Sequence, residues 1–248
     1  MQLSRKIEKL LSPDVFLSAW EHVCRWTHPN NAREIVATID RDELGRLRAR
    51  YPARTNAREI NLYENAAYWI GVNLRRVQDL WLDRTPPLRI LDLGCGPGYF
   101  LYISELFGHS GIGLDTPDEP LFEGLTQLLK IQRVITRIER QVALPDLREK
   151  FDLVTAHRVC FHRIARIGEH EWKEWSPVDW KFFIDDVRSR FLNPNARLLL
   201  EFNPRHSGSS GVTPEMRACF LAEGARIFRS KVLFAAERGR RPRFKQTR

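Results

Sequence analysis

Residues 88–98 read Leu-Arg-Ile-Leu-Asp-Leu-Gly-Cys-Gly-Pro-Gly, an apolar run followed by three alternating glycines. The run Leu88–Leu93 has the near-continuous apolar character of a strand buried on both faces of a parallel sheet. The glycines allow a tight backbone turn and a close approach to a ligand. Helical spacing of apolar residues follows over Tyr99–Phe107, and Gly108 is a natural stop. The order strand, glycine turn, helix predicts the first half of a βαβ nucleotide-binding unit.

The order of the glycines excludes two common nucleotide sites. A dinucleotide fingerprint needs Gly-x-Gly-x-x-Gly, but Tyr99 or Leu101 stands where its third glycine would be. The turn also lacks the Gly-Lys-Ser/Thr ending of a P-loop. Asp92, just ahead of the turn, would repel a pyrophosphate and attract a cation. These residues favour a cationic ligand.

The pattern Asp92-x-Gly94-x-Gly96-x-Gly98 resembles motif I of the class I S-adenosylmethionine (SAM) methyltransferases. The resemblance implies SAM as cofactor, and the fold and activity of that family. It also implies a set of cofactor-binding residues, namely Asp92, Gly94, Cys95, Gly96, Pro97, Gly98, Asp115, Thr116 and His157. The alternative for the glycines is an ordinary strand-to-helix turn.

A second strand is predicted at Ser110–Asp115, and it ends in an acid about 20 residues after the glycines. A carboxylate at this place can accept hydrogen bonds from both ribose hydroxyls. The alternative is that Asp115 caps the following helix, which Pro117 and Pro120 would begin.

Strands continue to alternate with helices toward the end of the chain. Further strands are predicted at Arg133–Ile138, Phe151–Ala156, Ala196–Asn203, Ala225–Phe228 and Lys231–Ala235, and helices at Val178–Phe191 and 213–224. The last two strands are separated by two residues, which requires antiparallel pairing. The predicted fold class is α/β, with a mostly parallel, seven-stranded, doubly wound sheet whose last strand is antiparallel, plus an N-terminal helical extension. The family resemblance covers about residues 85–236.

Three regions are predicted: a helical extension or lid at 1–84, a SAM-binding domain at 85–237 and a basic flexible tail at 238–248. Within the extension, Ser12 carries a helix-start signal and Asn61–Leu82 is periodic, with Asn73 interrupting the apolar face. Asn73 is expected to bond neighbouring backbone, with a pocket role as the alternative. The resemblance implies that Tyr63, Tyr68 or Trp69 belongs to a lid, although core packing is the better expectation for Trp69.

Composition is that of a folded enzyme of 248 residues, with 43% hydrophobic and 29% charged residues. No apolar run reaches the ~20 residues of a membrane span. Four scattered cysteines disfavour a disulfide framework and a zinc site, so we expect a cytoplasmic protein without a metal. The net charge is +9, and residues 238–248 contribute six basic side chains. They are expected to be a solvated tail, and the six arginines of Arg41–Arg58 are either an anion-binding surface or a charged linker.

The chemistry should lie after the fourth strand, because ligands of open α/β sheets bind beyond the carboxyl ends of the strands. Two histidines follow there, and histidine is the usual base near neutral pH. We expect His157 to contact the cofactor or acceptor and His162 to be the better base. Glu201 and Asn203 are further candidates. Trp172, Trp175 and Trp180 would either wall a pocket or pack under a loop.

Thr155-Ala-His-Arg158 stands where enzymes that methylate exocyclic base amines carry Asn/Asp-Pro-Pro-Tyr/Phe, so that class is disfavoured. The resemblance then implies methyl transfer to oxygen or nitrogen of a small-molecule acceptor. Two alternatives stay open: a methyltransferase acting on RNA or protein, with nucleic acid not favoured, and a non-catalytic SAM-binding protein. The sequence predicts no oligomeric state.

Overall fold

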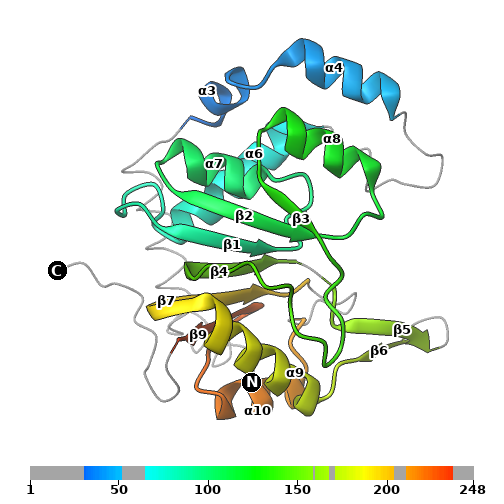
Figure 1. Ribbon diagram of the computed structural model, residues 1–248, viewed down its shortest axis with the longest axis vertical. Helices are drawn as coiled ribbons and strands as arrows, with labels where there is room; N and C mark the ends of the chain where they lie inside the picture. The colour runs from blue at the N-terminus through cyan, green and yellow to red at the C-terminus, as the bar shows by residue number, and fades with distance from the viewer. Residues whose placement is uncertain (1–30, 52–64, 159, 168–170, 204–210, 237–248) are drawn as a thin grey trace, which may run out of the picture.

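The computed structural model describes residues 31–51, 65–158, 160–167, 171–203 and 211–236. Its centre is a seven-stranded sheet in the order β3-β2-β1-β4-β7-β9-β8 (Figure 1). The strands are β1 (Arg89–Leu93), β2 (Ser110–Asp115), β3 (Arg133–Ile135), β4 (Phe151–His157), β7 (Leu192–Glu201), β8 (Arg226–Phe228) and β9 (Lys231–Ala235). The helices are α3 (Ala32–Ala37), α4 (Arg41–Arg50), α6 (Ala66–Asp79), α7 (Tyr99–Leu106), α8 (Pro120–Leu128), α9 (Pro177–Asp186), the π-helix η1 (Val187–Phe191) and α10 (Pro214–Ala222).

The sheet confirms the predicted fold class. β1 pairs in parallel with β2 and β4, β2 with β3, and β4 with β7. β9 lies between β7 and β8 and is antiparallel to both. From β1 the chain adds β2 and β3 on one side of the sheet, whereas β4 and β7 lie on the other side of β1. The position between β1 and β4 is therefore the switch point at which open α/β sheets bind ligands.

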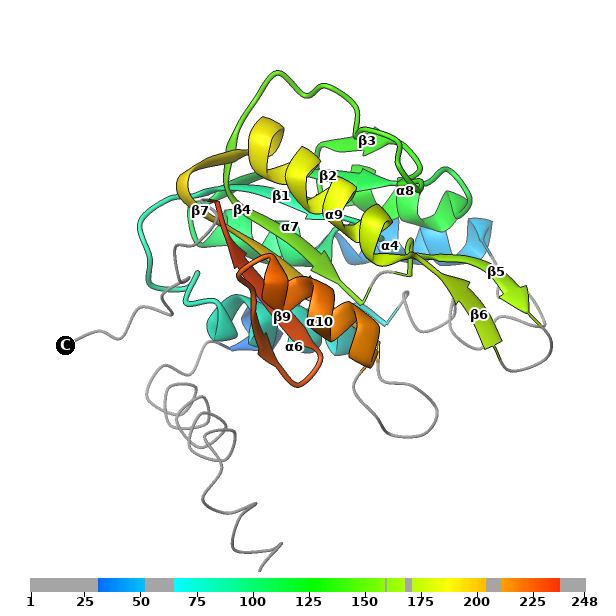
Figure 2. The same cartoon turned by 90° about the horizontal axis from the view of Figure 1, so that it is seen from below.

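Side chains alternate between two cores on the two faces of the sheet. Leu91, Leu93, Val154 and Leu198 pack with residues of α9 and α10, whereas Ile90, Leu153, Leu199 and Leu233 pack with α3, α6 and α7. Figure 2 shows α9 and α10 together on one side of the sheet. Successive side chains along a strand point to opposite faces of the sheet. A residue two places after Ile90, Leu153 or Leu199 therefore also faces α6 and α7. That rule positions the polar residues of the site.

Several boundaries differ from the sequence predictions. The third strand ends at Ile135 rather than Ile138, the fifth spans Leu192–Glu201, and the long helix after 177 finishes in a π-helix. Residues 41–50 form helix α4, capped by Asp40, so this part of the arginine-rich segment is not a linker. A separate two-stranded sheet was not predicted from the sequence: β5 (Arg163–Ile167) pairs with β6 (Glu171–Glu174) and projects from the main sheet (Figure 2).

Other expectations concern the helices and tryptophans. The helix expected over Asn61–Leu82 is α6, from Ala66 to Asp79, and Trp69 packs against the core as expected. Trp175 and Trp180 are core residues, which supports the packing alternative for these two. Ser12, Tyr63 and residues 238–248 lie outside the described residues. In the part of the chain that the structure describes, no helix is both long and apolar enough to cross a bilayer.

Candidate active site at the carboxyl edge

The glycine turn has the backbone that its sequence requires. Gly94, Gly96 and Gly98 have φ values of 70°, 53° and 82°, in the left-handed region that other residues rarely adopt. The Gly94 and Cys95 amides both donate to the Leu114 carbonyl, at 2.7 and 3.1 Å, which ties the turn to the end of β2. The turn therefore lies at the edge of the sheet where β1, β2, β4 and β7 end, which we call the carboxyl edge.

Asp115 is fixed against this turn. Its Oδ2 accepts the Gly96 N–H at 2.6 Å and its Oδ1 accepts the Thr116 N–H at 2.8 Å. Helix α8 is capped by Glu119, so the alternative role of Asp115 as its cap is wrong. Burial raises the pKa of the Asp115 carboxyl, against the backbone hydrogen bonds that lower it. A carboxylate held in this way keeps lone pairs available for hydroxyl donors.

Asp92 is buried at the end of β1, beside β4. Its Oδ1 accepts the Thr155 hydroxyl at 2.7 Å, and Thr155 is its register partner on β4. Burial raises the pKa of Asp92 to about 7, although the Thr155 hydrogen bond and the charge of Arg76 lower it. A buried carboxyl of this kind gains from pairing with a cation.

The other predicted cofactor-binding residues lie in the same turn. The side chain of Cys95 is buried against β2: a Cβ on Gly113 would lie 2.3 Å from Cys95 Sγ. Cys95 therefore offers a ligand only its backbone. Pro97 is buried, and Thr116 follows Asp115 at the end of β2.

His157 and Glu201 are register partners at the ends of β4 and β7. His157 Nδ1 lies 3.0 Å from Glu201 Oε2, and the two side chains are 6% and 8% exposed. Burial lowers the pKa of His157 to about 4, while the Glu201 hydrogen bond raises it. The imidazole is thus neutral, with Nδ1 donating to the carboxylate. Among the described residues the buried Nε2 atom has no hydrogen-bond partner.

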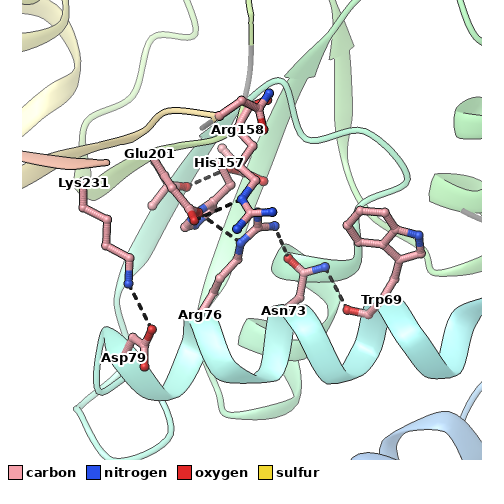
Figure 3. Close-up of polar contacts among 11 residues, drawn as sticks. Trp69, Asn73, Arg76, Asp79, His157, Arg158, Glu201 and Lys231 are labelled. Atoms are coloured by element: carbon pink, nitrogen blue, oxygen red, sulfur yellow. Dashed lines mark hydrogen bonds and ion pairs between the residues drawn. The ribbon is translucent and has the colours of Figure 1, made fainter. Parts of the chain in front are cut away.

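Helix α6 completes a polar cluster that is buried except for Arg158, which we call the Glu201 network: Asn73, Arg76, His157, Arg158 and Glu201 (Figure 3). Arg76 Nε lies 3.3 Å from Glu201 Oε2, and Arg158 Nε lies 3.3 Å from Glu201 Oε1. Asn73 accepts from Arg76 at 2.9 Å and donates to the Trp69 carbonyl at 3.0 Å. The expectation that Asn73 bonds neighbouring backbone is therefore confirmed. The cations and the His157 hydrogen bond lower the pKa of Glu201 against its burial, which raises it.

The ring of His162 contacts aromatic residues that do not belong to the Glu201 network. It is 2% exposed, and its ring centroid lies 5.5 Å from Trp180 and 5.3 Å from Phe202, within the core on the opposite face of the sheet. Its role as a base stays a prediction, and the contacts favour His157. Asn203 holds the backbone after β4, since its Nδ2 donates to the Arg158 carbonyl at 2.9 Å.

Sequence reasoning missed Arg76 and Arg158. Arg76 lies on a helix distant in sequence from both strands, so only the folded chain brings it to Glu201. A weak signal existed in the spacing of Asn73 and Arg76, which places them on one helical face. Among the described residues, no group of three or more His, Cys, Asp or Glu side chains could hold a metal ion.

The parallel sheet, the antiparallel strand β9 near its end and the glycine turn after β1 agree with the fold expected from the resemblance to class I SAM-dependent methyltransferases. No family model and no curated protein sequence matches the chain. Several solved structures show a low similarity to the chain. The ribosomal protein L11 methylase from Lactobacillus delbrueckii subsp. bulgaricus is 17% identical, over 65% of this chain and 78% of its own, with a TM-score of 0.39.

Two further similar structures are an amino pentose methyltransferase from Micromonospora echinaspora and a 16S rRNA methyltransferase of T. thermophilus. The first is 21% identical over 57% of this chain and 56% of its own, with a TM-score of 0.38. The second is 19% identical over 66% of this chain and 41% of its own, with a TM-score of 0.41. The chain spans less than two thirds of the length of these two proteins.

Proposed function

We propose that the protein is a SAM-dependent methyltransferase that acts on oxygen or nitrogen of a small-molecule acceptor. The observation that supports this most is the hydrogen bond from the Gly96 amide to Asp115. It joins the glycine turn and the end of β2 at the switch point of the sheet, beside the buried acid Asp92. The predicted cofactor-binding residues thereby share one edge, and their chemistry fits a nucleoside that carries a cationic amino acid.

Each of the predicted cofactor-binding residues would contact a different part of the ligand. Asp115 would accept the ribose hydroxyls, and the glycine turn would let the ligand approach the backbone. Asp92 would balance the ammonium group of the ligand, since a buried carboxyl with a pKa of about 7 ionises readily beside a cation. When bound, SAM supplies a methyl group on a sulfonium, ready for in-line displacement.

His157 is the proposed base. With Nδ1–H donated to Glu201, the lone pair of Nε2 is available to an acceptor hydroxyl or amine. The proton of the acceptor group would move to Nε2 of His157 as the acceptor takes the methyl group that bound SAM would supply. An oxygen that gains a methyl group becomes far more acidic, so a base with a pKa of about 4 suffices. Glu201 then stabilises the imidazolium that forms.

A further reason favours a functional Nε2. A buried polar atom without a partner costs about 1–3 kcal/mol, and a ligand or substrate that supplies the partner removes that cost. Among the described residues that contact Glu201, His157 has such an atom in its Nε2. This supports a catalytic or binding role over a purely structural one.

The direct test is calorimetric titration with S-adenosylhomocysteine (SAH), followed by transfer of labelled methyl from SAM to fractions of a cell extract. Micromolar SAH binding with label in the small-molecule fraction supports the proposal. Label in RNA or protein would favour the macromolecular alternative, which depends on residues 238–248 and 41–58. Binding without any transfer would favour a non-catalytic protein. Absence of SAH binding would refute all three.

A further inference from the structure

Arg158, the residue after His157, has a backbone conformation that needs explanation. Its φ is 58°, in the left-handed region that non-glycine residues rarely adopt. Both of its peptide groups are held: its N–H donates to the Glu201 carbonyl at 2.7 Å, and its carbonyl accepts from Asn203 at 2.9 Å. The ends of β4 and β7 therefore fix this arginine in place at the carboxyl edge.

The Glu201 network carries one positive charge more than it balances. Arg76 and Arg158 both contact Glu201, and His157 is neutral. Lys231 and Asp79, at 3.0 Å, balance each other nearby. Asp92 is the next carboxyl along the sheet, and the proposed function assigns it to the ammonium group of the cofactor. One guanidinium charge is left for another ligand.

Arg158 is the guanidinium that a ligand can reach. Its side chain is 54% exposed, whereas that of Arg76 is 12% exposed and also donates to Asn73. Only Nε of Arg158 contacts Glu201, and in the part of the chain that the structure describes the terminal nitrogens donate to no side chain. Four N–H donors in a planar fork thus lie next to the residue that we propose as base.

We propose that Arg158 selects a small acceptor that carries a carboxylate, which docks on the terminal nitrogens of this arginine and brings a hydroxyl or amine to His157. This rests on the proposed function for the transfer step. A single guanidinium matches a planar carboxylate with two parallel hydrogen bonds. A surplus of one charge is balanced by a monovalent carboxylate, whereas a phosphate dianion would need a second available cation. Arg76 does not supply it, because Glu201 and Asn73 engage it.

The test uses benzoate as the carboxylate probe and benzamide as its neutral match, titrated calorimetrically into the full chain with and without saturating SAH. We expect the protein to bind benzoate and not benzamide. Arg158→Gln should weaken benzoate binding by about tenfold or more and leave the Kd for SAH unchanged. The control is Arg89→Gln, an arginine that is 47% exposed, is also paired with a glutamate, and begins β1 at the opposite edge of the sheet. This variant should bind benzoate as the wild type does.

Each other outcome overturns the proposal. If Arg158→Gln weakens SAH instead of benzoate, the arginine binds the carboxylate of the cofactor. If both variants lose benzoate equally, the attraction is a general effect of net charge. Inorganic phosphate bound more tightly than benzoate would refute the choice of a carboxylate. Failure of the proposed function is distinguishable: SAH would then not bind, while the dependence of benzoate binding on Arg158 would persist without SAH.

Discussion

His157 and Glu201 face each other across the parallel strands β4 and β7, with Nδ1 and Oε2 at 3.0 Å. Because both belong to the strand ends themselves, their geometry is fixed by backbone pairing rather than by a loop. The carboxylate selects the tautomer that leaves Nε2 unprotonated. A pair of this kind orients a base and stabilises its protonated form.

The first prediction separates the two histidines. His157→Gln should lower the rate of methyl transfer by about 10²-fold or more, because the proton acceptor is lost. Glu201→Gln should also lower it, since the charge that raises the pKa of His157 disappears. The measurement is label transfer from SAM, with the Kd for SAH as a check on folding. A larger loss in His162→Phe than in His157→Gln would make His162 the base.

The second prediction concerns pH. The carboxyl of Asp92 has a pKa of about 7 in the free protein, so its charged fraction rises as pH rises from 6 to 8. The charged form attracts the ammonium of SAH, and affinity should therefore increase about tenfold over this range. Asp92→Asn keeps an acceptor for the Thr155 hydroxyl but cannot ionise. Calorimetry of this variant should show weak binding with little dependence on pH, and an unchanged slope would disprove the assignment.

The third prediction compares two acids near the end of β2. Asp115→Ala should weaken SAH binding by about tenfold to a hundredfold, because charge-assisted hydrogen bonds to the ribose hydroxyls are lost. Asp118→Asn is the matched control: it lies three residues on, is 57% exposed and pairs with Arg137. It should bind SAH normally. Equal effects of the two substitutions would indicate a general electrostatic influence instead of a specific contact.

The fourth prediction tests the packing beneath the glycine turn. A Cβ on Gly113 would lie 2.3 Å from Cys95 Sγ and 2.7 Å from Cys95 Cβ, so Gly113→Ala should destabilise the fold by about 1–3 kcal/mol. A Cβ on Gly71, in α6, meets nothing within 4 Å. Gly71→Ala should instead stabilise the protein by up to about 1 kcal/mol. Urea unfolding measures both, and a tolerated Gly113→Ala would mean that Cys95 can move aside.

The sequence predicts well those structural features that depend on residues close together in the chain. Leu88–Leu93 predicts a strand and Gly94–Gly98 a turn from neighbouring residues alone. The acid at Asp115, at the end of the next strand, is likewise recognised from its local sequence. The sequence of helix α4 also contains helix-start signals, namely Asp40 as N-cap and acids in the first turn. Its arginines, however, favoured an anion-binding surface or a charged linker. The Asp40 cap and the acids of the first turn outweighed the low hydrophobicity of the helix.

What the sequence could not provide is the pairing of distant segments. Glu201 was a minor candidate, because its contact with His157 depends on the register of β4 with β7. For Arg76 the sequence carries only its helical spacing from Asn73, and the contact with Glu201 depends on how α6 packs on the sheet. Position in the sequence favours His162 as the base, whereas the fold places aromatic rings around it. The predicted boundary at residue 84 remains a proposal.

Helix α6 has a practical consequence for work with shorter versions of the chain. Its Ile70 and Val77 share a core with Ile90 and Leu153 of the sheet, and its Arg76 opposes the charge of Glu201. A fragment that starts at residue 85 lacks α6, so it would expose Ile90 and Leu153 to water and leave Glu201 without Arg76, at a cost of several kcal/mol. Any truncated protein intended for crystallisation or screening should therefore begin upstream of Asn65.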